Sequence, residues 1–315
     1  MTDQMIRATA ANGHLRVVAV TNTLTVNEAS RRHQLSPIAT AALGRALSAC
    51  SMLTSSMKQR QGRVNVRFCG DGPLGLVYAD AGVDGTVRGF VSEDLPVTKA
   101  LHPYDPVSGR LDIQAGIGQV GLLKVMRDIG YGEPYTSTVQ MTSGEIDENI
   151  AWYLASSEQT YSKLVVSEIF VNPDQSSEVQ ISGGVFVQML PGSTLSEDLV
   201  HQLEAIIKPQ IFQDLLQSGL NLQQIIDQLF AKLSLSMLPL QQPIKFSCRC
   251  SFDRMLGALK ILGEVDLKEM IAENKGAEAK CHFCGETYHA STADLEDLLT
   301  ELTQEITEEV PAESV

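Results

Sequence analysis

Two stretches near the C-terminal end, Phe246-Ser247-Cys248-Arg249-Cys250-Ser251 and Cys281-His282-Phe283-Cys284, carry four of the chain's six cysteines. One residue separates the first two cysteines, two residues separate the last two, and thirty residues lie between the pairs. Four thiols in two close pairs are typical of a tetrahedral zinc site. The stretches therefore predict one zinc ion per chain in the reduced protein, held by Cys248, Cys250, Cys281 and Cys284.

The residues around the cysteines support a small metal-dependent module at 241-300. With one residue between Cys248 and Cys250, an extended strand there directs both sulfurs to the same face. Gly285 suits a tight turn after the second pair. Either His282 or His289 could replace one thiolate as a ligand. The spacer carries apolar residues at helical period, namely Met255, Leu256, Leu259, Ile261, Leu262, Leu267, Met270 and Ile271.

Zinc at such a site can be purely structural or part of a redox switch. Thiolates held by a metal are deprotonated, which makes them targets for peroxide or hypochlorous acid. Because metal binding supplies folding free energy to so small a module, losing the ion unfolds it. The cysteines alone leave both roles open.

Composition limits the remaining classes of protein. The chain has 315 residues, of which 43% are hydrophobic, enough for one large or two ordinary domains and too many for wholesale disorder. No stretch approaches the ~20 apolar residues that span a bilayer. The first sixteen residues lack the apolar core of a secretory signal, so a cytoplasmic location with reduced thiols is expected.

The chain is strongly acidic. It has 24 Lys and Arg against 38 Asp and Glu, a formal charge of −14. Nucleic-acid phosphates repel such a protein, so no nucleic-acid partner is expected. Beyond Lys280 nine acidic residues and no basic ones follow, which predicts a solvated, partly frayed segment ending in an acidic tail at 301-315.

Residues 1-192 are expected to form one α+β domain, because strands and helices alternate there without a regular βαβ rhythm. One helix begins with Ser36 as N-cap and Pro37 in the first turn and continues to about residue 58. Two more are predicted at 121–128 and 144–156. Strands are predicted at 15–20, 64–68, 76–79, 87–91, 164–171 and 185–190.

Residues 193-240 form a chain of short amphipathic segments. Thr194 and Glu197 have the spacing of a capping box, while Pro209 and Gly219 interrupt the helical pattern. One interpretation is a helical cap packed on the first domain. The other is a metastable linker whose apolar faces can become exposed, because segments this short need packing to stay helical.

Other motifs do not support an enzyme. Gly116-Ile117-Gly118-Gln119-Val120-Gly121 matches a dinucleotide-binding fingerprint but lacks the required strand and acidic ribose ligand, so a glycine turn before a packed helix is predicted. Cys50 and Cys69 are expected to be buried or half-buried, and Trp152 and Tyr153 to belong to the core. No histidine forms an evident catalytic triad.

The chain resembles the redox-regulated heat-shock holdases of about thirty-three kilodaltons, a family of bacterial and organellar chaperones. The cysteine spacing of one, thirty and two residues is typical of that family. The resemblance covers nearly the whole chain, and its matching stretches are residues 246–251, 256–263, 281–284 with Tyr288, 101–106, 116–127 and 153–159.

This resemblance implies an N-terminal α+β domain, a helical linker and a zinc redox-switch domain. It implies that oxidation joins Cys248 to Cys250 and Cys281 to Cys284, ejects zinc, and unfolds the switch domain and linker. The activated homodimer then holds unfolding client proteins without ATP. The alternative is an enzyme or adaptor, including a zinc-ribbon nucleic-acid adaptor, with a purely structural four-cysteine site.

Overall fold

The chain forms two compact units, Met1–Ser247 and Cys248–Val315. The computed structural model describes residues 2–92, 111–171, 176–193 and 196–309. For residues 305–309 it describes the backbone alone. The predicted α+β class is confirmed: two six-stranded sheets and a set of helices make up the described part of the first unit. Among the described residues, no helix is both long and apolar enough to cross a membrane.

The first sheet is antiparallel and has apolar side chains on both faces. Val18 and Val20 of one strand point into one hydrophobic cluster, while Val17 and Ala19 point into another. The strands, in spatial order, are β10 (Ser236–Met237), β1 (Gln4–Ala10), β2 (Leu15–Thr21), β9 (Val179–Met189) and β8 (Ser162–Phe170), and β11 (Gln242–Pro243) pairs with β1 as well.

The second sheet is antiparallel except at one edge. Its outermost strand, β12, runs parallel to β5. The strands, in spatial order, are β12 (Lys245–Phe246), β5 (Thr86–Val91), β4 (Leu76–Gly82), β3 (Arg63–Gly70), β6 (Gly121–Asp128) and β7 (Tyr135–Gln140).

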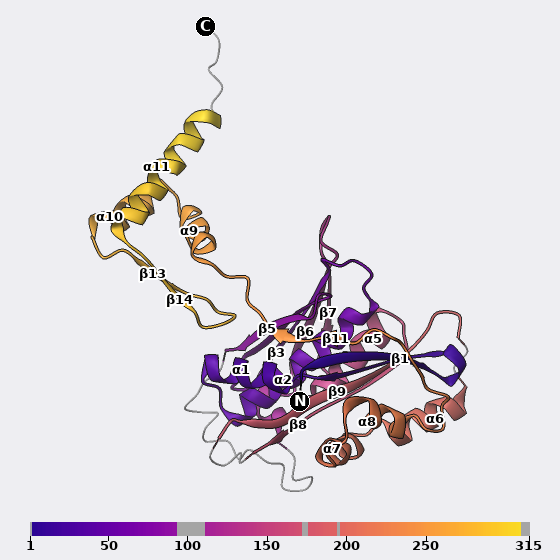
Figure 1. Ribbon diagram of the computed structural model, residues 1–315. Helices are drawn as coiled ribbons and strands as arrows, with labels where there is room; N and C mark the ends of the chain where they lie inside the picture. The colour runs from indigo at the N-terminus through magenta and orange to yellow at the C-terminus, as the bar shows by residue number, and fades with distance from the viewer. Residues whose placement is uncertain (1, 93–110, 172–175, 194–195, 310–315) are drawn as a thin grey trace. The chain divides into compact units, whose positions relative to one another are not determined.

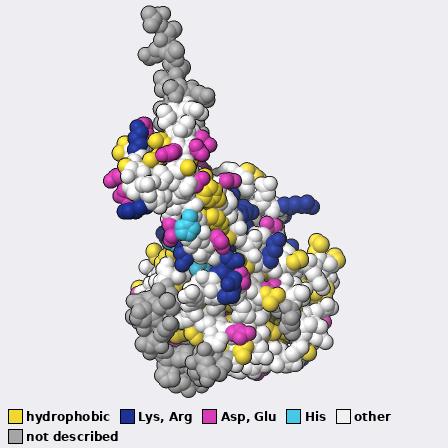
Figure 2. Space-filling model, turned by 60° about the vertical axis from the view of Figure 1, so that its left-hand side comes forward, with side chains coloured by type: hydrophobic (Ala, Val, Ile, Leu, Met, Phe, Trp, Pro, Cys, Tyr) yellow, Lys and Arg dark blue, Asp and Glu magenta, His cyan; other side chains and the backbone are white. Residues whose placement is uncertain are grey.

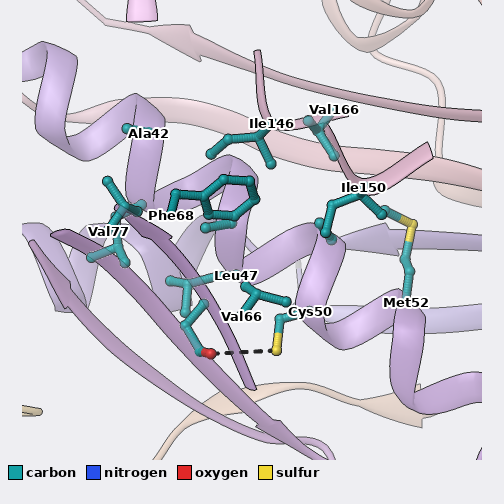
Figure 3. Close-up of a cluster of buried hydrophobic side chains, with 14 of the residues drawn as sticks. Ala42, Leu47, Cys50, Met52, Val66, Phe68, Val77, Ile146, Ile150 and Val166 are labelled. Atoms are coloured by element: carbon teal, nitrogen blue, oxygen red, sulfur yellow. Dashed lines mark hydrogen bonds between the residues drawn. The ribbon is translucent and has the colours of Figure 1, made fainter. Parts of the chain in front are cut away.

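Helix α2 (Pro37–Leu53) contacts both sheets and forms the centre of the first core (Figure 1). Ser36 caps it by accepting a hydrogen bond from the Ala39 amide at 3.2 Å, as the sequence predicts. Every residue from Ile38 to Leu53 is buried, which suits a helix rich in alanine and apolar on all sides. Figure 3 shows its side chains packed against Phe68 and Val77. Helices α1 (Thr23–His33), α4 (Ile113–Ile117) and α5 (Ile146–Ser157) complete this layer.

A buried charge network crosses this core. The Arg45 guanidinium on α2 lies 3.0 Å from the Glu168 carboxylate and 2.9 Å from that of Glu145. Only 3% of Arg45 is exposed. A charge at this depth is tolerated because opposite charges and hydrogen bonds replace its lost hydration.

The helices of 193-240 cover the opposite face of the first sheet (Figure 1). They are α6 (Glu197–Ile206), α7 (Pro209–Gln217) and α8 (Leu222–Leu229). Their buried side chains include Leu203, Phe212 and Ile226, which pack against the β1, β2 and β9 residues that face away from α2. The predicted breaks at Pro209 and Gly219 are confirmed, since Pro209 opens α7 and Gly219 has φ +75°.

Three very short strands follow α8 and attach residues 236–246 to both sheets. Strands β10 and β11 pair with β1, two residues each, and β12 pairs Lys245 with Thr86 and Phe246 with Val87. Gln242 adds side-chain contacts: its Oε1 accepts from Arg7 at 2.8 Å and its Nε2 donates to the Val83 carbonyl at 2.6 Å. This segment leads directly into the cysteine module.

The second unit contains three helices and one hairpin among its described residues. A small core of Met255, Leu267, Ala290, Leu295 and Leu298 holds them together. The elements are α9 (Phe252–Lys260), α10 (Glu264–Ala272), β13 (Ala277–Lys280), β14 (Thr287–Ala290) and α11 (Thr292–Glu309). The predicted helical spacer is confirmed as α9 and α10.

The helix predicted at 121–128 is wrong. The segment is strand β6, where Leu123 and Val125 are buried and Leu122 and Lys124 are exposed, a period of two instead of 3.6. The glycine fingerprint is therefore not a turn before a helix. A Cβ on Gly121 would lie 2.2 Å from the Cys69 carbonyl oxygen. The lack of a side chain at Gly121 therefore allows β6 to lie close to β3.

Three further expectations need correction. The acidic stretch beyond Lys280 is more than a frayed tail: it forms β14 and α11, and Leu295 and Leu298 are buried. Cys69 is exposed, and Trp152 is 47% exposed, because each lies on the outward side of its element. Cys50 and Tyr153 are buried as expected.

Two helix ends also differ from expectation. The predicted capping box at Thr194 lies outside the described residues, and α6 is capped by Ser196, which accepts from the Leu199 amide at 3.2 Å. Helix α2 ends at Leu53 rather than near residue 58, with a 3-10 turn following at Thr54–Ser56. The helix predicted at 144–156 is confirmed as α5.

Replacing Arg45 by Leu is expected to lower the free energy of unfolding of the first unit by about 3–5 kcal/mol, because two carboxylates lose their buried counter-charge. Urea denaturation followed by circular dichroism measures the loss. The control is Arg31→Gln, which breaks an exposed ion pair with Glu28 on α1 and should change stability far less. Equal losses in the two variants would contradict the assigned role of Arg45.

Candidate metal centre

The first cysteine pair lies between β12 and α9. Phe246 ends β12, and Cys248 and Cys250 follow outside any strand, so the expected extended strand through both cysteines is wrong. Ser251 then caps α9 by accepting from the Arg254 amide at 3.2 Å. The first pair therefore lies in the segment that leads into α9.

The second pair lies in the turn that joins β13 to β14. The Cys281 amide donates to the Glu286 carbonyl, and the Gly285 amide donates to the Cys281 carbonyl, both at 2.8 Å. Gly285 has φ +71°, a backbone conformation that glycine adopts without strain. This is the tight turn that the sequence predicts after Cys284.

The turn between β13 and β14 and the segment before α9 bring all four sulfurs together. The four Sγ atoms lie within 4.8 Å of one another. The Sγ atoms of Cys248 and Cys281 are 3.7 Å apart, and those of Cys250 and Cys284 are 3.3 Å apart. Four sulfur ligands at such separations can surround a single metal ion.

The two histidines considered as substitute ligands are not part of this group. The structure assembles a set of four cysteines from the residues it describes, and neither His282 nor His289 belongs to it. His289 lies across the hairpin from Glu278, with its Nδ1 3.4 Å from the carboxylate.

The remaining cysteines lie in the first unit and outside the cluster. Cys50 is buried in α2, where its Sγ donates to the Val64 carbonyl at 3.0 Å. Burial raises the pKa of the Cys50 thiol and keeps it protonated. Cys69 lies exposed on β3.

The local environment raises the pKa values of two of the clustered thiols. Burial is the main cause for both Cys281 and Cys284, and hydrogen bonds from neighbouring thiols add to it at Cys284. Only 4% of Cys284 is exposed. Without a cation these thiols hold their protons at neutral pH, so a bound metal must displace protons.

One residue beside the thiols was not identified as functional from spacing alone. The Tyr288 hydroxyl donates to Cys250 Sγ at 3.2 Å, and that bond raises the pKa of Tyr288. Tyr288 pairs with Ala279 across the β13–β14 hairpin. Recognising the hairpin register would have placed this hydroxyl near the turn. Such outer contacts orient metal ligands.

Comparisons with known proteins agree along nearly the whole chain. Residues 3–291 match the family model described as "Hsp33 protein". A 33 kDa chaperonin of Cyanothece sp. (strain PCC 7425) is 50% identical over 306 residues, covering 97% of this chain and 99% of its own. The 33 kDa chaperonin of Synechocystis sp. (strain PCC 6803) is 46% identical over 311 residues, which cover 98% of this chain and 100% of the relative. The 33 kDa chaperonin of Thermotoga maritima is 29% identical in sequence. Its crystal structure matches with a TM-score of 0.82, and the match covers 96% of this chain and 100% of that one.

Metal affinity is expected to rise with pH across the neutral range. The raised pKa values of Cys281 and Cys284 mean that these two thiols are protonated there without a metal, and each thiol that becomes a thiolate ligand releases a proton. Isothermal titration in two buffers of different ionisation enthalpy counts the protons, and up to four per ion are expected from four cysteines. An affinity that does not change between pH 6 and pH 8 would contradict this ligand set.

Proposed function

The chain belongs to the Hsp33 family of chaperones, and from that premise we propose that it is an ATP-independent holdase switched on by oxidation. The observation that carries the redox part is the cluster of four thiols within 4.8 Å. In this proposal the reduced, metal-bound chain is inactive. Oxidation of the cluster releases the metal and exposes a surface that binds unfolding proteins.

Zinc is the metal that fits this site best. Thiolates are soft ligands, and four of them favour a tetrahedral zinc ion over ions that prefer oxygen. The small core of the second unit makes its folding depend on the bound ion. When bound, zinc supplies structural cross-linking and keeps Cys248, Cys250, Cys281 and Cys284 as thiolates.

Oxidation of the cluster requires an external oxidant such as peroxide. Two thiolates, one peroxide molecule and two protons give one disulfide and two water molecules, so two peroxide molecules oxidise all four cysteines. The family resemblance implies the pairs Cys248–Cys250 and Cys281–Cys284. The short Sγ separations favour Cys248–Cys281 and Cys250–Cys284 as the alternative.

The surface that oxidation exposes is the interface between α6–α8 and the first sheet. These helices have ten, nine and eight residues, too short to be stable alone in water. Buried side chains such as Leu203, Phe212 and Ile226 each contribute about 1.5–3 kcal/mol by burial. Releasing the helices therefore uncovers apolar side chains on both the helices and the sheet.

An exposed apolar surface of this kind suits two partners. It binds unfolding client proteins, and it pairs with a second oxidised copy to form a homodimer. We place this activity in the cytoplasm, where reduced thiols keep the switch inactive until oxidants accumulate. Nucleic acid and membranes are not proposed as partners. On the face in Figure 2, Lys and Arg side chains lie interspersed with Asp and Glu instead of forming one continuous basic surface.

The competing proposal is an enzyme or adaptor with purely structural zinc. It predicts that oxidation destroys the second unit without creating any new activity. Family membership favours the chaperone, because the relatives are named chaperonins along matched chain lengths.

Peroxide with mild heat is expected to release one zinc ion per chain and to create holdase activity in the same time course. Zinc is followed with a chromogenic chelator and activity by light scattering of an aggregating client without ATP. Peptide mapping should find two disulfides within the cluster, with Cys50 and Cys69 still free thiols. If zinc-free, oxidised protein fails to suppress aggregation, the holdase proposal is wrong and the structural-zinc proposal replaces it.

Ile225→Asp is expected to produce holdase activity with less oxidant than the native chain needs. Ile225 on α8 is 1% exposed, so a carboxylate there weakens the packing of the helices on the sheet. The matched control is Ile211→Asp on α7, where the native side chain is already 37% exposed. If both variants need as much peroxide as the native chain, the helix–sheet interface is not the regulated surface.

A further inference from the structure

Strand β7 forms one outer edge of the second sheet. It pairs with β6 on one side, and no strand among the described residues pairs with its other side. Four of its six residues are exposed, including Tyr135, of which 60% is exposed. A row of backbone groups along this edge is therefore open to a further strand.

One hydrogen bond at the end of β7 fixes which backbone groups point outward. The Met141 amide donates to the Gly121 carbonyl at 2.9 Å, in the register that continues the β6–β7 pairing. Along an antiparallel ladder, residues that bond the neighbouring strand alternate with residues that do not. Every second residue counted back from Met141 therefore bonds β6. The N–H and C=O groups of Thr136, Thr138 and Gln140 point away from β6.

The other ladder of β6 agrees with this assignment. The Asp71 amide donates to the Val120 carbonyl at 2.9 Å, in continuation of the β3–β6 register. Even-numbered residues of β6 therefore bond β3, and its odd-numbered residues bond β7, as the Met141 bond requires. Nowhere in the described part of the chain do the outward groups of β7 have a hydrogen-bond partner.

The other sheet edges are protected in ways that β7 is not. Strand β8, at the far edge of the first sheet, contacts α5 and α7, and most of its residues are buried. Strands β10 and β12 have only two residues each. Strand β7 has six residues and carries no charge, proline or bulge, the features that usually protect an exposed edge.

We propose that β7 binds an extended segment of an unfolding protein as an added strand. An extended backbone presents donors and acceptors that match those of a free sheet edge, so these hydrogen bonds form with any sequence. On one face the added strand lies beside the polar side chains of Thr136 and Thr138. On the other face it lies beside Tyr135 and half-buried Val139. This arrangement favours segments that alternate polar and apolar residues.

A second copy of this chain fits the edge less well. Two six-residue strands side by side bury far less than the roughly 1,000 Å² of a stable protein interface. Weak, reversible pairing suits the transient capture of an unfolding segment instead. The nature of the partner rests on the proposed function. The site itself lies on the second sheet, outside the interface of α6–α8 with the first sheet, so its binding does not require oxidation.

The test adds a peptide of alternating threonine and valine, with a lysine at each end, to reduced, metal-loaded full-length protein. N-methylation of every second amide blocks one edge of this probe, which stops it from forming sheets with itself. The control peptide is methylated at every amide and has no donor edge. Amide hydrogen exchange, followed by NMR, is the readout. With the probe at ten times its Kd, exchange at Thr136, Thr138 and Gln140 should slow by about tenfold. The control peptide should bind at least about tenfold more weakly.

Variants at Thr138 connect the binding to the edge. Thr138→Pro removes one outward donor and no bond to β6, a position at which an edge strand tolerates proline. It should weaken probe binding by about tenfold or more, whereas Thr138→Ala keeps the amide and should leave the affinity unchanged. If Thr138→Pro fails to fold, the two peptides on the native chain still decide the question.

The outcomes separate this proposal from the redox proposal. Oxidised protein should bind the probe with unchanged affinity at the same three amides. A chain that binds the probe at β7 but lacks holdase activity after oxidation contradicts the redox proposal alone. Equal binding of the two peptides, or protection of other amides only, would overturn the β7 proposal alone. Exchange at the three amides that slows with rising protein concentration, without peptide, would identify a second copy as the occupant and would also overturn it.

Discussion

A sheet with apolar side chains on both faces is the constraint on which the rest of this structure depends. One face of the first sheet packs against α2, a helix apolar on all sides. The other face, with Val17, Ala19 and Val185, cannot remain in water without a large free-energy cost, so something must cover it. The chain supplies α6, α7 and α8 for this purpose, and they pack on the face of the sheet opposite α2.

One stretch of backbone joins helices α6–α8 to the cysteine module. Residues 236–246 follow the α6–α8 region and end two residues before Cys248, and they are paired to β1 and β5 along the way. The module itself has only a small apolar core. In the proposed function a metal ion therefore stabilises the second unit, which has the smaller apolar core, while the first unit depends on ordinary hydrophobic burial. In the proposed function, oxidation of the four sulfurs therefore acts on the second unit and on α6–α8, while the core around α2 keeps its own packing.

The sequence predicted that these four cysteines lie together, because cysteine spacing is a local property of the chain. Six strands, β2 to β5, β8 and β9, and the α2 cap were also predicted, since alternation and capping depend on near neighbours. Strand β6 was missed because its alternation of Leu123 and Val125 with exposed residues is short, and the preceding glycines favoured a helix. Helix α11 was missed because its acidic composition is typical of an exposed tail. Leu295 and Leu298 are buried there through packing with α10, which local sequence does not indicate. Tyr288 could be placed only through the register of a hairpin.

The three short strands of residues 236–246 have a kinetic consequence. Each ladder joins just two residue pairs, and β12 runs parallel to its neighbour while β10 and β11 run antiparallel to theirs. A segment held by so few ladder hydrogen bonds opens locally at a lower free-energy cost than the long ladders of the same sheets. Residues 236–246 therefore open more often than β2, β8 or β9.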